Sequence, residues 1–127
     1  MPAAEAVVDL ADALFAAIER GDEPRIDALF ADDVGVWRAG AQHDDDKVRA
    51  MKVLRWFIRL TAERSYEILD RQLFPDGFVQ QHVLHATGHT GGLIALRVCI
   101  VIKFNGNDLI TRIDEYFDTA QLAPLMS

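Results

Sequence analysis

The hydrophobic pattern of the chain changes its period near Ser65, and this change constrains the fold more than any other feature of the sequence. Before Ser65, apolar residues recur at the spacing of about 3.6 that is typical of a helix. After it, apolar and polar residues alternate with the period of about two that is typical of a strand. The order of the two patterns predicts the α+β class, in which helices come first and then cover one face of a sheet.

Three helices are predicted in the first half of the chain. The first spans residues 4–20, and the second is a short helix that Asp22 caps and that ends at residues 31–33. A short strand is predicted over residues 34–38. The acidic residues 44–46 suit the start of a third helix, which carries a run of basic side chains.

Turn residues divide the second half into a meander of antiparallel strands. The strand predicted over residues 93–104 is apolar on both sides, since Leu96 and Val98 occupy one side and Cys99 and Val101 the other. A sheet with two apolar faces needs two covers, so we expect helices on one face and a second subunit on the other. The predicted strands are 66–74, 78–87, 93–104 and 109–118, followed by a turn at 119–125.

The strand at residues 109–118 carries an acid on each side. Alternation puts Glu115 beside Ile113 and Phe117, and puts Asp114 on the opposite side. Whichever side faces inward therefore brings a carboxylate into an apolar interior. A buried carboxylate is costly unless it is paired, hydrogen-bonded or protonated, so this strand is a candidate functional site. The pattern alone leaves open which of the two acids faces inward.

Length and charge exclude several classes of protein. The 127 residues suit a single domain spanning 1–127, and the net charge of −7 argues against nucleic acid as a partner. No apolar run reaches the roughly 18 to 20 residues of a membrane span, so we expect no membrane contact and a cytoplasmic location. The four histidines lack metal-ligand spacing, and we expect no metal and no cofactor.

Two stretches carry a resemblance to a known superfamily. Residues 30–34 read FADDV, and residues 110–118 read ITRIDEYFD and are followed by AQLAPL. Together with the three N-terminal helices, these stretches resemble the SnoaL-like branch of the nuclear-transport-factor-2-like superfamily. The resemblance implies three helices packed on a strongly curved, mostly antiparallel sheet that forms a conical barrel with an internal apolar pocket, commonly dimerising through the sheet.

The superfamily includes ketosteroid isomerases, polyketide cyclases, limonene-type epoxide hydrolases and non-catalytic binding modules, so the fold alone does not choose a reaction. The resemblance places Glu115 at the acid of the hydrolases, but Val83 and His85 at their arginine and second aspartate, so the hydrolase set is broken. It places Arg38 at the proton-abstracting aspartate of the isomerases, which disfavours that chemistry. Glu115 with His85 is similar to the acid and imidazole of the cyclases.

Alternation on the strand 78–87 predicts that one side lines the pocket with mixed apolar and polar residues, and that His82 faces the other way. Glu115 and His85 are then the predicted proton-transfer groups, and Arg38 is predicted to steady an enolate or a ligand carboxylate. In the alternative interpretation Glu115 only pairs with Arg38 inside the fold. The predicted ligand-binding residues are Trp37, Trp56, Gln81, Val83 and Phe117.

We therefore expect a homodimer that binds a small, largely apolar molecule. The leading hypothesis is a cofactor-independent acid/base enzyme of the isomerase, cyclase or hydrolase type. The alternative is a non-catalytic ligand carrier or a dimeric interaction module of the same fold.

Overall fold

The computed structural model describes residues 4–126. The predicted helix at residues 4–20 and the predicted strand at 93–104 are both found with the predicted bounds. Among the described residues, no helix is long and apolar enough to cross a membrane. In chain order the elements are α1 (Ala4–Arg20), α2 (Glu23–Leu29), β1 (Phe30–Arg38), α3 (Lys47–Leu60), β2 (Thr61–Phe74), β3 (Gly77–Gly88), β4 (Leu93–Phe104), β5 (Ile110–Tyr116) and the 3₁₀ helix η1 (Thr119–Met126).

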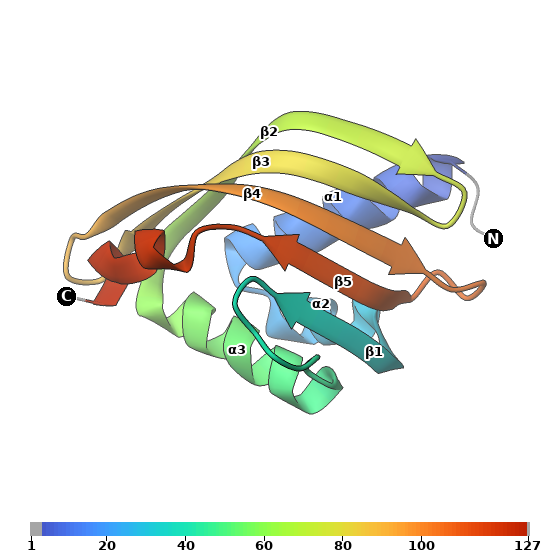
Figure 1. Ribbon diagram of the computed structural model, residues 1–127, viewed down its shortest axis with the longest axis horizontal. Coiled ribbons are helices and arrows are strands. Elements are labelled where there is room, and N and C mark those ends of the chain that lie inside the picture. The colour runs from blue at the N-terminus through green and yellow to red at the C-terminus, as the bar shows by residue number, and fades with distance from the viewer. Residues whose placement is uncertain (1–3, 127) are drawn as a thin grey trace.

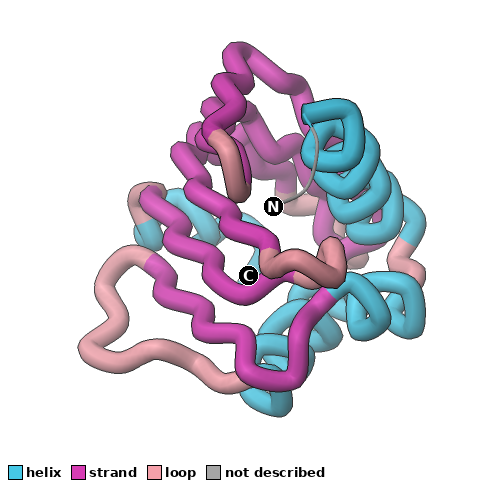
Figure 2. The backbone as a smooth tube through the Cα atoms, turned by 90° about the vertical axis from the view of Figure 1, so that its right-hand side faces the viewer, coloured by secondary structure: helices cyan, strands magenta, loops and turns pink. Residues whose placement is uncertain are grey.

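The five strands form one mixed sheet in the order β1-β5-β4-β3-β2. β1 runs parallel to β5, and all the other neighbours are antiparallel. Register shifts in β2, one of them between Ile68 and Asp70, bend this long strand. Within the described residues, the three α-helices cover the concave face, and the opposite face carries no helix (Figures 1 and 2). The α+β class is confirmed, although the sheet stays an open cone whose edges are β1 and β2.

β1 begins at Phe30, four residues before the predicted start at residue 34. The reason is that Phe30 is already extended, with φ −91° and ψ 131°, at the position that ends α2. Its side chain is buried and it pairs with Ile110 of β5. The strand therefore starts directly from the short helix, and α2 is shorter than predicted.

The inward side of β3 is the opposite of the predicted one. Directly opposed residues of two antiparallel strands lie on the same face, and β4 fixes that face because Leu96 and Val98 are buried in the core. Leu84 is opposite Leu96 and His82 is opposite Val98, so these residues of β3 face inward. The buried residues of β3 are Phe78, Gln80, His82, Leu84 and Ala86.

The tail after β5 forms η1 instead of the predicted simple turn. It packs against the β3–β4 connection, where a Cβ atom on Gly92 would lie only 2.0 Å from the Pro124 carbonyl oxygen. Glycine is therefore required for this close approach. Leu125 is buried as a result, and Leu122 comes to line the cavity described below.

Arg64 joins the ends of two helices to β2. Its guanidinium donates hydrogen bonds to the carbonyl oxygens of Ile18 and Glu19 in α1, and to those of Ile58 and Thr61 at the end of α3. The last carbonyl groups of a helix have no partner within the helix, so Arg64 satisfies several of them at once. This junction fixes α1 and α3 on either side of the cavity.

Candidate functional site

A cavity of about 140 Å³ lies between α1, α3 and the concave face of the sheet. Of the described residues that line it, only Arg38 and Glu115 are charged. An apolar cavity with a few polar groups is the usual form of a small-molecule site. The lining residues are Leu14, Phe15, Ile18, Phe30, Val36, Arg38, Val53, Leu54, Trp56, Phe57, Tyr66, Leu84, Leu96, Ile100, Ile113, Glu115, Phe117 and Leu122.

Glu115 is the inward acid of β5. It lines the cavity together with Ile113 and Phe117, whereas Asp114 on the other side is bonded to Arg112. Burial raises the pKa of Glu115, and the positive charge of Arg38 lowers it less than burial raises it. The Glu115 carboxyl group therefore stays protonated to a higher pH in the cavity than it would in solvent.

Arg38 reaches the same cavity from the end of β1. Parallel pairing places Arg38 next to Glu115 in register, and the Arg38 Nε atom lies 3.8 Å from Glu115 Oε1. The shorter contact of Arg38 is with Asp45, whose Oδ2 atom lies 3.0 Å from Nη1. Both carboxylates thus share one guanidinium, and Asp45 holds it more closely.

The backbone of the β1–α3 loop fixes Asp45 in place. Val36 and Asp45 exchange two backbone hydrogen bonds, of 3.0 Å and 2.7 Å, and form an isolated antiparallel bridge. Asp46 then caps α3 by accepting a hydrogen bond from the Arg49 backbone N–H. The predicted acidic start of the third helix is therefore found, and it also supplies the partner of Arg38.

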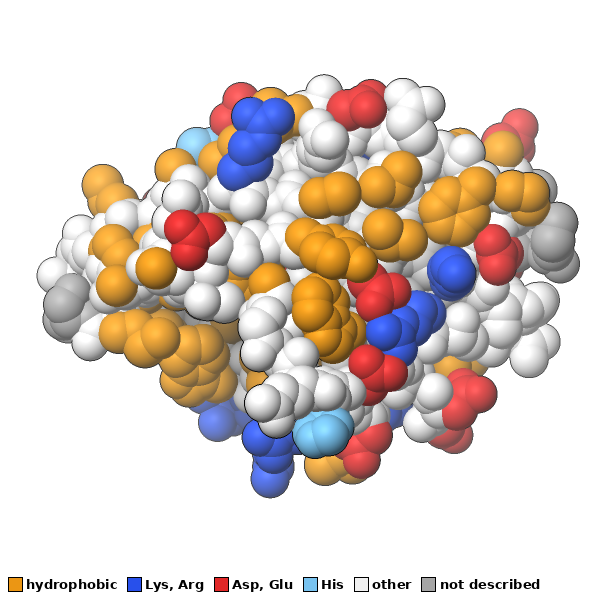
Figure 3. Space-filling model, viewed as in Figure 1, with side chains coloured by type: hydrophobic (Ala, Val, Ile, Leu, Met, Phe, Trp, Pro, Cys, Tyr) orange, Lys and Arg blue, Asp and Glu red, His pale blue; other side chains and the backbone are white. Residues whose placement is uncertain are grey.

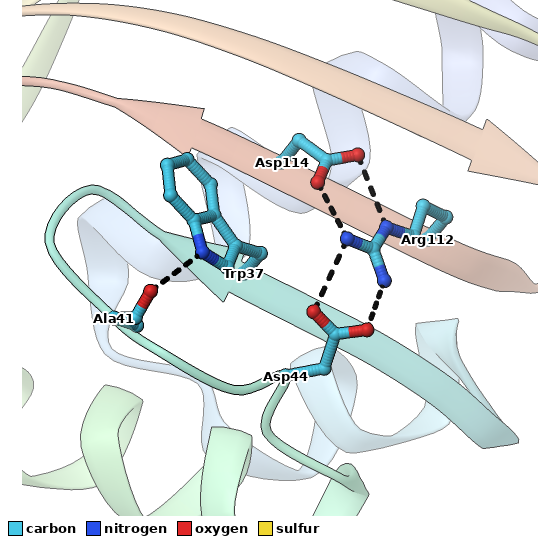
Figure 4. A network of polar contacts seen from close by, with 5 residues as sticks. All are labelled: Trp37, Ala41, Asp44, Arg112 and Asp114. Atoms are coloured by element: carbon cyan, nitrogen blue, oxygen red, sulfur yellow. Dashed lines mark hydrogen bonds and ion pairs between the residues drawn. The ribbon is translucent and has the colours of Figure 1, made fainter.

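On the outer side of the sheet a second polar network holds the same loop (Figure 4). Arg112 lies between Asp44 of the loop and Asp114 of its own strand, and it bonds to both carboxylates. Trp37 belongs to this outer side as well, since its Nε1–H donates to the Ala41 carbonyl oxygen at 2.9 Å. The prediction that Trp37 lines the pocket is wrong, because β1 turns its side chain away from the cavity.

His85 does not meet Glu115. Its side chain is 47% exposed on the outer side of β3, where Nε2 lies 2.9 Å from Glu67 Oε1. Gln81 and Val83 lie on the same outer side and do not line the cavity. The predicted placement of these three residues is wrong for the reason given above, the register of β3 against β4.

Two of the predicted ligand-binding residues do reach the cavity. Trp56 of α3 lines it while keeping 46% of its surface exposed, and Phe117 lines it just after β5. The inward positions of β3 carry no arginine and no aspartate, so the hydrolase set that the resemblance leaves broken at Val83 and His85 is not restored by the inward side of this strand.

Tyr66 is a lining residue that the sequence interpretation missed. It is opposite Leu84 in the β2–β3 register, which turns its ring toward the cavity. The sequence carries little indication of this, because the two sides of the predicted strand 66–74 are equally polar. Alternation therefore did not tell whether Tyr66 faces inward.

The far end of the concave face holds a separate buried network. Gln80 Nε2 lies 2.8 Å from His82 Nδ1, and Gln80 Oε1 accepts a hydrogen bond from Arg71. Arg71 also pairs with Asp12 of α1 at 2.9 Å. Burial, together with the charge of Arg71, lowers the pKa of His82 to about 4, so His82 is neutral near pH 7. The network ties α1 to the sheet and lies outside the cavity.

Within residues 4–126, no group of three histidine, cysteine or acidic side chains is arranged to hold a metal ion. What the cavity offers is therefore a carboxyl group of raised pKa, a cation and a phenol set in an apolar wall. Such a set can bind an oxygen-bearing end of an apolar molecule and exchange a proton with it.

A family model of the SnoaL-like domain matches residues 11–113, which is more than half of the chain. The chain therefore belongs to the SnoaL-like domain family, and the resemblance stated from the sequence is confirmed. No curated protein matches the chain.

Solved structures share the fold at low sequence identity. An LEH-like epoxide hydrolase from M. tuberculosis has a TM-score of 0.80 and 17% identity, over 98% of this chain and 92% of that chain. RV0760c from Mycobacterium tuberculosis, in complex with estradiol-17β-hemisuccinate, has a TM-score of 0.79 and 17% identity, over 91% and 96% of the two chains. IdmH from Streptomyces antibioticus has a TM-score of 0.77 and 18% identity, over 94% and 98%. Likeness at this level shows a common fold and no particular activity.

Proposed function

We propose that the cavity binds a small, largely apolar molecule that carries a carbonyl group, and that Glu115 exchanges a proton with the carbon beside it. One observation carries the proposal: Glu115 lies in an apolar wall with its pKa raised by burial, and its nearest cation is held more closely by Asp45. A carboxylate of raised pKa is a stronger base than one in solvent.

The proton transfer needs no cofactor. The Glu115 carboxylate takes a proton from the carbon next to the carbonyl, and the electron pair of that C–H bond forms the C=C bond of an enolate. The negative charge moves to the carbonyl oxygen, where the Arg38 guanidinium stabilises it. Glu115 then returns the proton to the same carbon or to a conjugated one. His85 has no part in this step because it lies on the outer side of the sheet.

The structural neighbours support a small-molecule site in this fold. One is an epoxide hydrolase, another was solved with estradiol-17β-hemisuccinate, and a third is a computationally designed binder of 17-OHP with a TM-score of 0.80 and 18% identity. These ligands and activities belong to those proteins. They favour, for this chain, a ligand with a ring system and a few oxygen atoms.

A non-catalytic carrier is the alternative, and the 3.8 Å contact between Arg38 and Glu115 favours it. An acid that serves only as the partner of a cation would bind a ligand without changing it. The two functions differ in one measurable property, the exchange of ligand protons with solvent.

The test uses 2-acetylnaphthalene, an apolar ketone whose methyl protons lie beside the carbonyl, in D₂O. We expect binding in the cavity and deuterium incorporation, measured by ¹H NMR, above the rate without protein. Glu115→Gln should keep binding and lose the exchange. The matched control is Glu67→Gln, which removes an exposed carboxylate from the outer side of the sheet. Binding without exchange in the wild type would establish the carrier, and absence of binding would refute both functions.

We also propose that the chain forms a homodimer through the outer sheet face, meaning the side of the sheet that the helices leave uncovered. Hydrophobic side chains gather across the middle of this face (Figure 3). Tyr116 is 51% exposed there, and Cys99 is partly exposed. A second copy would supply the missing cover. The partly or largely exposed apolar residues of this face include Trp37, Val79, Val83, Leu93, Ala95, Cys99, Val101 and Tyr116.

A further inference from the structure

Tyr66 is the third polar group of the cavity, after Arg38 and Glu115, and the function proposed above gives it no part. It belongs to β2, whereas Arg38 belongs to β1 and Glu115 belongs to β5. The backbone position of Tyr66 is fixed by a hydrogen bond to α1. The Tyr66 backbone N–H donates to the Glu19 carboxylate of α1 at 2.9 Å, which fixes this point of β2 against the helix.

The Tyr66 ring is held on two sides by aromatic rings. The Phe15 centroid lies 4.8 Å away at an interplanar angle of 61°, and the His82 centroid lies 4.9 Å away at 87°. Edge-to-face pairs of this kind favour a single ring orientation. The ring is therefore fixed before any ligand arrives.

The Tyr66 hydroxyl has no hydrogen-bond partner among residues 4–126. Buried tyrosines usually pair this group, because leaving it unpaired loses a hydrogen bond that water would provide. The hydroxyl oxygen is also not fully enclosed. Among residues 4–126, the side-chain nitrogen or oxygen atom that is both fully enclosed and without a hydrogen-bond partner is Arg71 Nη2. A fixed, unpaired hydroxyl at the wall of a cavity is arranged to meet a ligand.

We propose that Tyr66 is a ligand-binding and specificity residue, whose hydroxyl donates a hydrogen bond to the carbonyl oxygen of the bound molecule. The inference rests on the proposed small-molecule function and narrows its ligand class. An aromatic or alicyclic ketone, aldehyde or ester satisfies the hydroxyl, whereas a hydrocarbon of the same shape leaves it unpaired.

The charges around Tyr66 suit a donor. Burial raises the pKa of Tyr66, and the negative charges of Glu115 and Glu19 raise it further, against the opposing effect of Arg64. The phenol therefore keeps its proton at neutral pH, and it can donate but cannot serve as an anion.

The experiment compares two probes of one shape, 2-acetylnaphthalene and 2-isopropenylnaphthalene, in which a methylene group replaces the carbonyl oxygen. Tyr66→Phe removes only the hydroxyl and keeps the ring contacts. The chain offers a matched control in its other tyrosine, because Tyr116→Phe removes a hydroxyl from the outer sheet face. Affinities are measured by fluorescence titration or calorimetry, and the carbonyl stretch of the bound ketone by infrared spectroscopy.

We expect Tyr66→Phe to weaken ketone binding roughly 3- to 10-fold, the usual effect of one neutral hydrogen bond, and to leave the hydrocarbon unchanged. The carbonyl stretch of the bound ketone should move to higher frequency in Tyr66→Phe, and its frequency should be unchanged in Tyr116→Phe. A purely structural role for Tyr66 would not move that frequency.

Three results would overturn the inference. Equal ketone affinity and an unmoved stretch in Tyr66→Phe would refute the role of Tyr66 while the cavity function stands. A fall of several degrees in the melting temperature of Tyr66→Phe would show that the hydroxyl has a partner inside the protein. Failure of both probes to bind the wild type would refute the proposed function itself, and the role of Tyr66 with it.

Discussion

Asp45 holds Arg38 at 3.0 Å through the carboxylate oxygen Oδ2, on a loop that two backbone hydrogen bonds fix to β1. The carboxylate of Glu115 lies farther from the same guanidinium, at 3.8 Å. Asp45 therefore competes with Glu115 for the Arg38 guanidinium. This competition decides whether Glu115 behaves as half of an ion pair or as a free carboxyl group in an apolar wall.

Asp45→Asn should lower the pKa of Glu115. The substitution frees Arg38 to approach Glu115 and removes a nearby negative charge, and both changes favour the ionised carboxylate. The measurement is a ¹³C NMR titration of the glutamate carboxyl carbons, with Glu115 assigned by Glu115→Gln. Asp44→Asn is the matched control, because Asp44 pairs with Arg112 on the outer side. An unchanged or raised pKa would show that Asp45 does not govern the pair.

Glu115→Gln should gain stability relative to the wild type as the pH rises. Burial raises the folded-state pKa of Glu115 above its ordinary value of 4.5, so the folded protein holds a proton that the unfolded chain has lost. The wild type therefore loses stability as the pH rises from about 4.5 through the folded-state pKa. Thermal melts of both proteins at pH 5 and pH 8 test this. A variant that falls further behind the wild type at pH 8 would instead mark a structural ion pair.

Arg38→Met should destabilise the fold by roughly 1 to 3 kcal/mol, less than a fully buried pair would cost because its partners keep some exposure. The reason is that Asp45 and Glu115 both lose their counter-charge, and each of these side chains is only about a quarter exposed, at 22% and 26%. Chemical denaturation measures the free energy of unfolding. Arg49→Met removes the other cation beside Asp45, but Arg49 is 76% exposed, so it should change stability little. Equal losses in both variants would contradict the prediction.

Val101→Glu should shift the protein toward the monomer in analytical ultracentrifugation, because it places a charge in the proposed interface on the outer sheet face. Val48→Glu makes the same substitution on α3, where Val48 is 70% exposed, and should leave the assembly unchanged. Sedimentation of the wild type as a monomer at micromolar concentration would refute the proposed homodimer.

His82→Asn should reduce the loss of stability that the wild type shows as the pH falls from 6.5 toward 4. The pKa of His82 falls from 6.5 to about 4 in the folded state, so between these values the unfolded chain binds a proton that the folded protein does not. The contribution is complete above pH 6.5 and disappears as the pH falls toward 4, and it amounts to roughly 3 kcal/mol. Melts between pH 7 and pH 4 measure the slope. His85→Asn, on the exposed side of the sheet, is the matched control.

The sequence predicts the parts of the fold that have a strong apolar pattern. α1 has one apolar face, and β4 is apolar enough on both sides to be found with its bounds. Glu115 was correctly grouped with Ile113 and Phe117, because β5 places its acids on opposite sides. The loop aspartate that pairs with Arg38 could not be found, since no local pattern reports a contact made across a loop.

β3 shows where such reasoning fails. Its two sides are similar in polarity, with glutamine and histidine on each, so alternation identifies a strand without telling which side faces inward. The register against β4 decides this, and it buries Gln80 and His82 while exposing Gln81 and His85. The error placed His85 in the candidate site and hid Tyr66, whose side depends on the same register.

The order of strands has a consequence for how the molecule is made. β5 lies between β1 and β4, although it follows all the other strands in sequence, so its arrival joins the first strand to the rest of the sheet. A nascent chain that has not yet delivered β5 leaves open edges on both β1 and β4, which are prone to pairing with other chains. The contact between Arg38 and Glu115 spans much of the chain, and contacts of this kind form slowly. A chain that has not yet added β5 therefore has neither a complete sheet nor the pair of Arg38 and Glu115.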